Sequence, residues 1–137
     1  MTARLLPHLQ ALVGERYPVT EPEPLIAVEH DLVAQFAAMG SQVPRHSFES
    51  SYGAARNVIA IHDSPSGSAG LSTLLIGGHY IAVPGSLGAD DNASASAVLL
   101  EAVHVLKDAS FNRPFRFVAF CLEEQGLVGS TAYGRHG

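Results

Sequence analysis

Three short segments of the chain carry side chains that can bind a metal ion or transfer a proton. They are Gly77-Gly78-His79-Tyr80, Gly88-Ala89-Asp90-Asp91-Asn92 and Cys121-Leu122-Glu123-Glu124. One imidazole, a carboxylate able to bridge two ions and a pair of adjacent glutamates are the residue types with which a two-zinc hydrolase builds its site. These residue types therefore favour metal-assisted hydrolysis as the chemistry of the chain.

The apolar pattern of the chain predicts the elements that must position these segments. Apolar residues at helical spacing predict helices over 5–14, 20–40, 93–107 and 126–133. Thr20 and Glu23 have the spacing of a capping box, and Gly40 is expected to end the second helix. Short apolar runs predict strands over 43–48, 57–62, 71–78 and 115–122, and the composition of 64–70 predicts a loop.

Helices that alternate with apolar strands predict an α/β fold. The runs 71–78 and 115–122 lack a clean polar–apolar alternation, which is typical of strands buried on both faces. We expect a three-layer α/β/α sandwich with a mixed, largely parallel central sheet, formed by residues 1–137 as one domain. Its length is ordinary for one domain.

The predicted elements place the three segments at one edge of the sheet. His79 follows the strand over 71–78, the two glutamates end the strand that starts at 115, and the aspartates precede the helix at 93. Ligands of open α/β sheets gather at the carboxyl ends of the strands. Taken singly, a histidine after a strand, an Asp-Asp-Asn before a helix and a Glu-Glu pair have ordinary structural roles. Taken together, they favour a functional site.

The composition limits the possible partners of the chain. The net charge is −5 and Lys107 is the single lysine, so a nucleic-acid partner is not expected. Cys121 is the single cysteine, which excludes an internal disulfide framework. The apolar segment 5–13 contains Pro7 and is too short to span a membrane. We therefore expect no membrane partner and a cytoplasmic location.

The order and spacing of the segments resemble those of the zinc aminopeptidases of the aminopeptidase S and aminopeptidase Y type, whose relatives include the glutaminyl cyclases. The matching segments are Asn57-Val58-Ile59-Ala60, Gly77-Gly78-His79-Tyr80, Val83-Pro84-Gly85-Ser86, residues 88–94, residues 116–120 and residues 123–130. The Gly-Ala-Asp-Asp-Asn-Ala-Ser stretch favours the peptidases over the cyclases. The resemblance covers most of the chain from the second predicted helix onward.

The resemblance implies a role for four residues. His79 would bind one zinc ion, Asp91 would bridge two zinc ions, and Glu124 would bind the second ion. Glu123 would be the general base that takes a proton from the attacking water and passes it to the leaving amine. The implied cofactor is a pair of zinc ions, and the implied substrate is the N-terminus of a peptide.

Two features of the chain depart from the family pattern. The family has an aspartate two residues after the histidine, which orients the imidazole, whereas this chain has Ile81. Loss of such a partner typically lowers metal affinity or activity by about 10–100-fold. The family also draws a further carboxylate and a second histidine from segments after the Glu-Glu motif. We therefore expect 1–137 to be an incomplete domain, truncated after that motif, with partial or no zinc occupancy.

These observations leave three functional hypotheses. The first is a zinc-dependent aminopeptidase-type hydrolase with weak or no activity as an isolated chain. The second is a catalytically inactive half-domain that forms a homo-oligomer or binds a partner, since an uncovered sheet edge favours association. The third is acyl transfer of the glutaminyl cyclase type.

Overall fold

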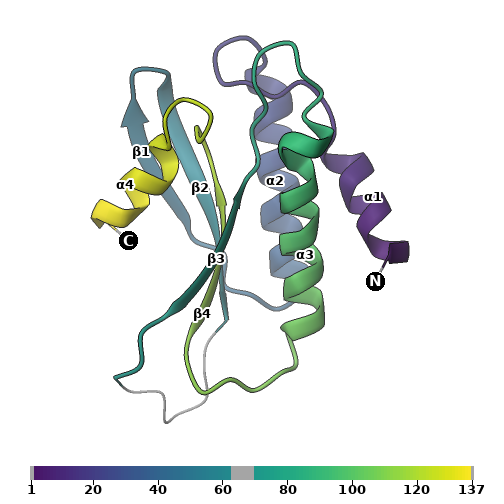
Figure 1. The fold of residues 1–137 in the computed structure, drawn as a ribbon, viewed down its shortest axis with the longest axis vertical. Coiled ribbons are helices and arrows are strands. Elements are labelled where there is room, and N and C mark those ends of the chain that lie inside the picture. The colour runs from purple at the N-terminus through teal and green to yellow at the C-terminus, as the bar shows by residue number, and fades with distance from the viewer. Residues whose placement is uncertain (1, 63–69, 137) are drawn as a thin grey trace.

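The computed structural model describes residues 2–62 and 70–136, and these residues form a twisted sheet with helices on both faces (Figure 1). The strands are β1 (Arg45–Ser50), β2 (Gly53–His62), β3 (Leu74–His79) and β4 (Phe115–Phe120). Their order is β1-β2-β4-β3, with antiparallel β1–β2 and β2–β4 pairs and a parallel β3–β4 pair. The predicted mixed sheet is confirmed, and one of the three pairings among the described residues is parallel.

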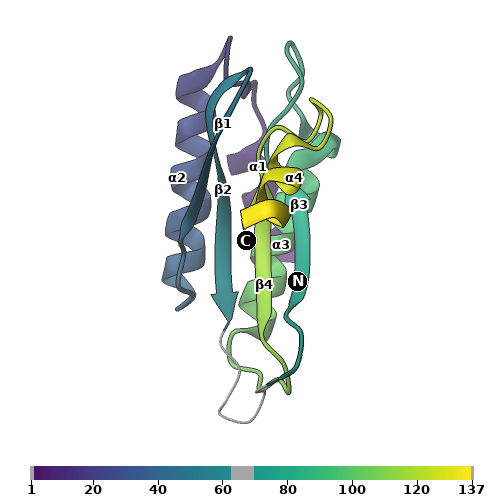
Figure 2. The same cartoon turned by 90° about the vertical axis from the view of Figure 1, so that its left-hand side faces the viewer.

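The described residues form four α-helices, which are α1 (Thr2–Leu12), α2 (Pro22–Ala38), α3 (Ser94–Leu106) and α4 (Val128–His136). Of these, α2 and α3 pack on one face of the sheet and α4 on the other, while α1 packs against α3. In Figure 2 the strands lie side by side, with α4 in front of them and α3 behind. Successive residues of a strand point to opposite faces, and accordingly Val58 and Ala60 of β2 join the core beneath α1–α3, whereas Ile59 packs with Tyr133 of α4. The three-layer α/β/α arrangement is confirmed.

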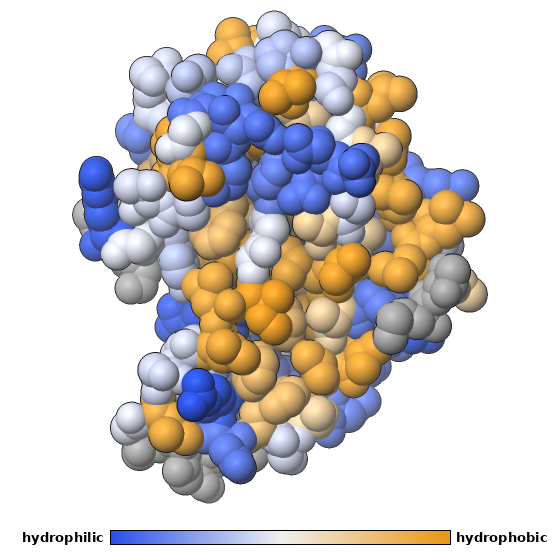
Figure 3. All heavy atoms as spheres, viewed as in Figure 1, coloured by the Kyte–Doolittle hydropathy of each residue, from blue (hydrophilic) through white to orange (hydrophobic). Residues whose placement is uncertain are grey.

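The two strands that carry the site differ in burial. Phe117, Val118 and Ala119 of β4 are at most 1% exposed, as expected for a strand buried on both faces. Leu74 and Leu75 of β3 are 40% and 41% exposed, so the same prediction is wrong for β3. The reason is its position, because β3 pairs with β4 and with no other strand among the described residues. Figure 3, viewed from the same side as Figure 1, shows a broad apolar area across the middle of the molecule.

The boundaries of the elements follow local signals. The capping box predicted at Thr20 and Glu23 is wrong: α2 begins at Pro22, and no described side chain caps it. Proline lacks an N–H and has a helical φ, so it begins a helix without needing that cap. The predicted stop at Gly40 is confirmed, with α2 ending at Ala38. None of the described helices has the length and apolarity needed to cross a bilayer.

Two further boundaries bear on the predictions. The strand predicted over 57–62 begins at Gly53, because a two-residue turn joins it to β1 with Ser50 opposite Gly53. The loop predicted over 64–70 falls almost wholly on residues 63–69, which lie outside the described residues. The remaining predicted helices and strands all appear, with ends shifted by a few residues.

Candidate metal centre

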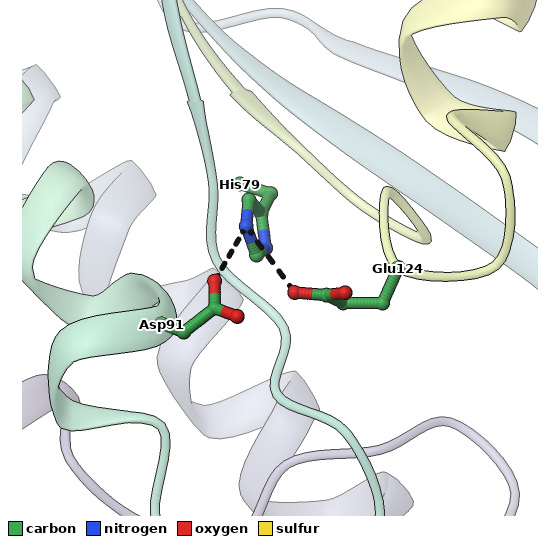
Figure 4. Close-up of side chains that lie close together, drawn as sticks. All are labelled: His79, Asp91 and Glu124. Carbon is green, nitrogen blue, oxygen red and sulfur yellow. Dashed lines mark ion pairs between the residues drawn. The ribbon is translucent and has the colours of Figure 1, made fainter.

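Three elements bring the predicted ligands to one edge of the sheet. His79 is the last residue of β3, and Glu124 lies in the loop that follows β4. Because β3 and β4 are parallel, their carboxyl ends lie side by side. Asp91 comes from the turn before α3, and Figure 4 shows the three side chains pointing toward one another. The predicted convergence of the segments is confirmed.

The geometry of the three side chains is that of a ligand group. Nε2 of His79 lies 3.1 Å from Oδ1 of Asp91 and 3.7 Å from Oε1 of Glu124. One possible ligand atom from each side chain lies within 4.8 Å of the other two. The side chains of His79 and Glu124 are 16% and 28% exposed, and that of Asp91 is 70% exposed. The group is thus anchored in the fold on one side and open to solvent on the other.

The donor atoms of this group fit a zinc ion. An imidazole nitrogen with two carboxylate oxygens is a common zinc ligand set. Hydrogen bonding with Asp91, then burial and the negative charge of Asp91, raise the pKa of the Glu124 carboxyl, while His79 opposes this shift. Two carboxylates held this close repel each other when both are ionised. A cation between them would remove that cost.

The imidazole lacks a hydrogen bond on its far side. Nδ1 of His79 is buried, and no described atom forms a hydrogen bond with it. A histidine that binds a metal through Nε2 carries its proton on Nδ1 and usually donates it to an oxygen. Ile81, two residues later, is fully buried and offers no acceptor. The ligand set fits zinc, but its imidazole is not oriented by the usual hydrogen bond.

In the turn before α3, the side chains of Asp91 and Asn92 have different neighbours. It spans Ala89–Ala93, and its peptide bond between Asp91 and Asn92 is cis. The side-chain oxygen of Asn92 accepts a hydrogen bond from the N–H of Ala95 at 3.1 Å, which satisfies a donor in the first turn of α3. Asn92 therefore caps the helix, and Asp91 faces His79.

Glu123 has a different environment from Glu124. Its two carboxylate oxygens accept hydrogen bonds from Ser130, one from the N–H at 2.7 Å and one from the hydroxyl at 2.8 Å. Ser130 lies in the first turn of α4, so these two bonds hold the Glu123 carboxylate at the start of that helix. Among the described residues, the ligand group comprises His79, Asp91 and Glu124, so Glu123 lies outside it. Its role as general base stays a prediction.

The loop that carries both glutamates has an unusual backbone. Leu122 and Leu127, on either side of it, have φ values of 59° and 60°, in the left-handed region that non-glycine residues rarely adopt. The N–H of Leu127 closes the turn on the carbonyl of Glu123 at 2.8 Å. Such conformations persist only where surrounding contacts hold them. The contacts of this loop therefore decide where the two carboxylates lie.

Two residues with long-range contacts to the site do not stand out in the sequence. Asn57 is fully buried and bonds to both ends of the loop that holds Glu123. Arg16 is 1% exposed and bonds to the loop between His79 and Asp91. In the sequence, Asn57 is a polar residue at the start of an apolar run and belongs to a segment that resembles the aminopeptidases, but neither signal indicates its contacts. Nothing in the sequence around Arg16 indicates its contacts either.

The family of the chain follows from comparison with known proteins. The model of the family described as Peptidase family M28 matches residues 57–137, which is more than half of the chain. The chain belongs to Peptidase family M28. Aminopeptidase YwaD of Bacillus subtilis (strain 168) is 48% identical over 58 residues, which cover 42% of this chain and 13% of that protein. The predicted aminopeptidase resemblance is thereby confirmed.

Solved structures place the fold within Peptidase family M28 and its relatives. A zinc aminopeptidase from Bacillus subtilis, BSAP, matches with a TM-score of 0.59 and 37% identity over 64% of this chain and 21% of that chain. The glutaminyl cyclase of Macrostomum lignano matches with a TM-score of 0.71 and 28% identity over 88% of this chain and 37% of that chain. The matched regions thus span between 13% and 37% of the lengths of these relatives.

Proposed function

We propose that this chain supplies three of the zinc ligands of an aminopeptidase-type hydrolase. The observation that carries the proposal is the convergence of His79, Asp91 and Glu124 from three separate segments onto one point. Membership of Peptidase family M28 and the 48% identity to an aminopeptidase support the hydrolase class. The proposed substrate is a peptide with a free N-terminus.

Each residue of the group has a proposed task. His79 would hold one zinc ion, Glu124 would hold a second, and Asp91, whose side chain is exposed and contacts His79, would bridge the two. Zinc, when bound, supplies a Lewis acid that polarises the peptide carbonyl and makes water a nucleophile near neutral pH. The exposure of Asp91 leaves the group open to a peptide that approaches from solvent.

Glu123 would move the proton. One carboxylate oxygen takes a proton from the attacking water as the oxygen of that water bonds to the carbonyl carbon. The same proton then passes to the nitrogen of the leaving amine as the carbon–nitrogen bond breaks. The hydrogen bonds from Ser130 hold the carboxylate in one orientation, which limits the reorganisation that proton transfer requires.

The zinc site is tested by metal titration of the metal-free chain. Zinc affinity is measured by competition with a coloured chelator for the wild type and for Asp91→Asn. We expect the variant to bind zinc at least about 10-fold more weakly, because it replaces a charged ligand. Asp90→Asn is the matched control, since Asp90 is an adjacent exposed aspartate outside the ligand group. Equal affinities for all three proteins would refute the site.

The catalytic step is tested with an aminoacyl 4-nitroanilide and the zinc-saturated chain. We expect slow release of nitroaniline, because the group has three protein ligands among the described residues and an unpartnered Nδ1. Glu123→Gln should lower the turnover by about 100-fold or more while leaving the zinc affinity unchanged. Absence of turnover by the zinc-saturated wild type would contradict the hydrolase activity of this chain.

The structural comparison supports a second candidate, acyl transfer of the glutaminyl cyclase type. The cyclase structure matches more of the chain than the aminopeptidase structure does, 88% against 64%. In this reaction the N-terminal amine of a glutaminyl peptide attacks its own side-chain amide and ammonia leaves. A coupled ammonia assay on a glutaminyl peptide separates the candidates, because the aminopeptidase releases free glutamine instead.

The exposed edge of the sheet supports a third candidate, a non-catalytic module that associates with itself or a partner. Leu74 and Leu75 of β3 expose two-fifths of their surface at this edge. Edge strands with exposed apolar residues pair readily with other chains. Light scattering over a range of concentrations tests this candidate, and a monodisperse monomer at high concentration would contradict self-association.

A further inference from the structure

Arg16 is buried against the loop that joins His79 to Asp91. It lies between α1 and α2, and its side chain is 1% exposed. Nε donates a hydrogen bond to the carbonyl of Tyr80 at 2.6 Å, and Nη2 donates to the carbonyl of Gly88 at 3.0 Å. Nη1 donates to the carbonyls of Leu87 and Gly14 at 3.1 Å and 2.7 Å.

The partners of Arg16 are backbone carbonyls. Among the described residues, no carboxylate lies within ion-pairing distance of its guanidinium, and burial lowers the pKa of this group. A buried charge is costly unless hydrogen bonds replace the lost water. The guanidinium has five N–H donors in a fixed plane, so it can hold several carbonyls at set positions. This arrangement indicates that Arg16 organises the backbone around it.

Three of the four carbonyls that Arg16 binds stand at the two ends of the loop that joins His79 to Asp91. Tyr80 directly follows His79, whereas Leu87 and Gly88 directly precede the turn that contains Asp91. Backbone bonds to the same segment reinforce these ties. The N–H of Ala82 donates to the carbonyl of Arg16 at 3.2 Å, and the N–H of Gly14 donates to the carbonyl of Leu87 at 2.9 Å.

Gly88 connects the guanidinium to the turn of Asp91. Its φ of +56° is in the left-handed region, and an added Cβ would lie 2.9 Å from Nη2 of Arg16 and 3.0 Å from the carbonyl oxygen of Asp91. The carbonyl of Gly88 also accepts a hydrogen bond from the N–H of Ala93 at 2.9 Å, at the end of the turn. A shift of the guanidinium would therefore displace the turn that carries the ligand.

We propose that Arg16 is a positioning residue that sets the separation between His79 and Asp91 and so determines the metal affinity of the group. The effect on metal affinity rests on the zinc site proposed above. The effect on the loop backbone is independent of that site. Arg16 also lies outside residues 57–137, the part of the chain that the family model matches.

The first test compares zinc affinities of three variants of the full chain. Arg16→Met removes all the donors of the side chain. Arg16→Lys retains a buried charge, but its ammonium group can bind fewer carbonyls. If Arg16→Met does not fold, the test uses Arg16→Lys alone. Arg4→Met is the matched control, because it removes an ion pair with Glu101 that lies between α1 and α3 and not at the loop. Affinities are measured by chelator competition at a temperature where circular dichroism shows folded protein.

We expect Arg16→Lys to bind zinc about 10-fold more weakly than the wild type. This is within the range of affinity losses seen for residues that orient metal ligands without binding the metal themselves. Arg4→Met should lower the melting temperature but leave the zinc affinity within about twofold of the wild type. A zinc affinity of Arg16→Lys that is also within twofold of the wild type, given a wild type that binds zinc, would overturn the proposal.

The second test needs no metal. Amide hydrogen exchange is measured for Ala82 and Ala93, whose N–H groups bond to Arg16 and Gly88, and for Val58 and Val118 in the central strands. We expect Arg16→Lys to speed exchange at Ala82 and Ala93 and to leave the strand amides unchanged. A uniform change, or none, would overturn the proposal. If the wild type binds no zinc, the proposed function fails, and this measurement alone decides the role of Arg16.

Discussion

The side-chain amide of Asn57 donates a hydrogen bond to the carbonyl of Gly129 at 2.9 Å. Its oxygen accepts a second bond from the N–H of Cys121, also at 2.9 Å. Cys121 and Gly129 stand on either side of the loop that carries Glu123 and Glu124. One buried side chain of β2 therefore bonds to both ends of the loop that carries Glu123 and Glu124, two of the three proposed carboxylates.

Replacement of Asn57 should destabilise the protein. Asn57→Ala would leave the N–H of Cys121 and the carbonyl of Gly129 buried without these partners, at about 1–3 kcal/mol for each group left unsatisfied. We expect a loss of about 2–4 kcal/mol in the free energy of unfolding, measured with urea. Ser50→Ala, which removes two hydrogen bonds in an exposed turn, should cost less than about 0.5 kcal/mol. Equal midpoints for the two variants would show that Asn57 contributes no more than a surface contact.

Two glycines of α4 should respond in opposite ways to alanine. A Cβ on Gly129 would collide with the carbonyl oxygen of Cys121 and lie 2.7 Å from Oδ1 of Asn57, whereas a Cβ on Gly134 would meet no described atom within 4 Å. We expect Gly129→Ala to cost about 3 kcal/mol or more, because the clash involves backbone. Gly134→Ala should raise stability by up to about 1 kcal/mol, since alanine favours a helix. Thermal unfolding followed by circular dichroism checks both, and a stable Gly129→Ala would mean that the loop can move away from β2.

The stability of the metal-free protein should depend on pH because the carboxyl groups of Glu124 and Asp91 interact. Hydrogen bonding with Asp91 raises the pKa of Glu124 in the folded chain, so the folded state holds a proton that the unfolded state has released. The stability of the metal-free protein should therefore fall as pH rises from the ordinary carboxyl pKa through the raised value. Glu124→Gln should remove this slope, as measured by urea midpoints over a pH series. In the same pH window the wild type should release protons when zinc binds. An identical slope in the variant would assign the effect to another group.

A hydrogen-bond acceptor for Nδ1 of His79 should raise the metal affinity and lower the stability of the metal-free protein. Nδ1 of His79 is buried and unpartnered among the described residues, and the resemblance implies an aspartate where this chain has Ile81. We expect Ile81→Asp to strengthen zinc binding about 10-fold. The same change should cost the metal-free protein about 1–3 kcal/mol, because it places a polar group in the core.

Ile81→Val is the matched control for this experiment. It keeps the position apolar and removes a single methylene, so it should cost about 0.5–1.5 kcal/mol and leave the zinc affinity unchanged. A zinc affinity of Ile81→Asp no higher than that of Ile81→Val would show that residue 81 does not reach Nδ1.

Periodicity and motif order were sufficient to predict the elements and the convergence of His79, Asp91 and Glu124. The apolar runs predict the strands because burial requires them, and the polar residues at their ends mark the edge where a site forms. Position within the sheet was not predictable for β3. An apolar run shows that a strand can be buried, but the number of its neighbours depends on segments elsewhere in the chain.

The contacts that hold the site in place were not predictable. Arg16 bonds to carbonyls more than 60 residues away, and Asn57 bonds to Cys121 and Gly129 across similar separations. A side chain that bonds to backbone carries no information about which residues it contacts, because every residue offers the same carbonyl and N–H. The cap at Thr20 and Glu23 failed for a local reason, since Pro22 already begins the helix.

The contacts of Arg16 have a practical consequence for anyone who shortens this protein. A fragment cut to the family match would begin at Asn57 and lose α1, α2, β1 and the arginine. The carbonyls of Tyr80 and Gly88 would then lose their buried donors, and Leu32 and Phe36 of α2, both fully buried, would be missing from the core. Such a fragment should aggregate or stay unfolded. The segment that matches the family model is thus shorter than the part of the chain whose residues build the core.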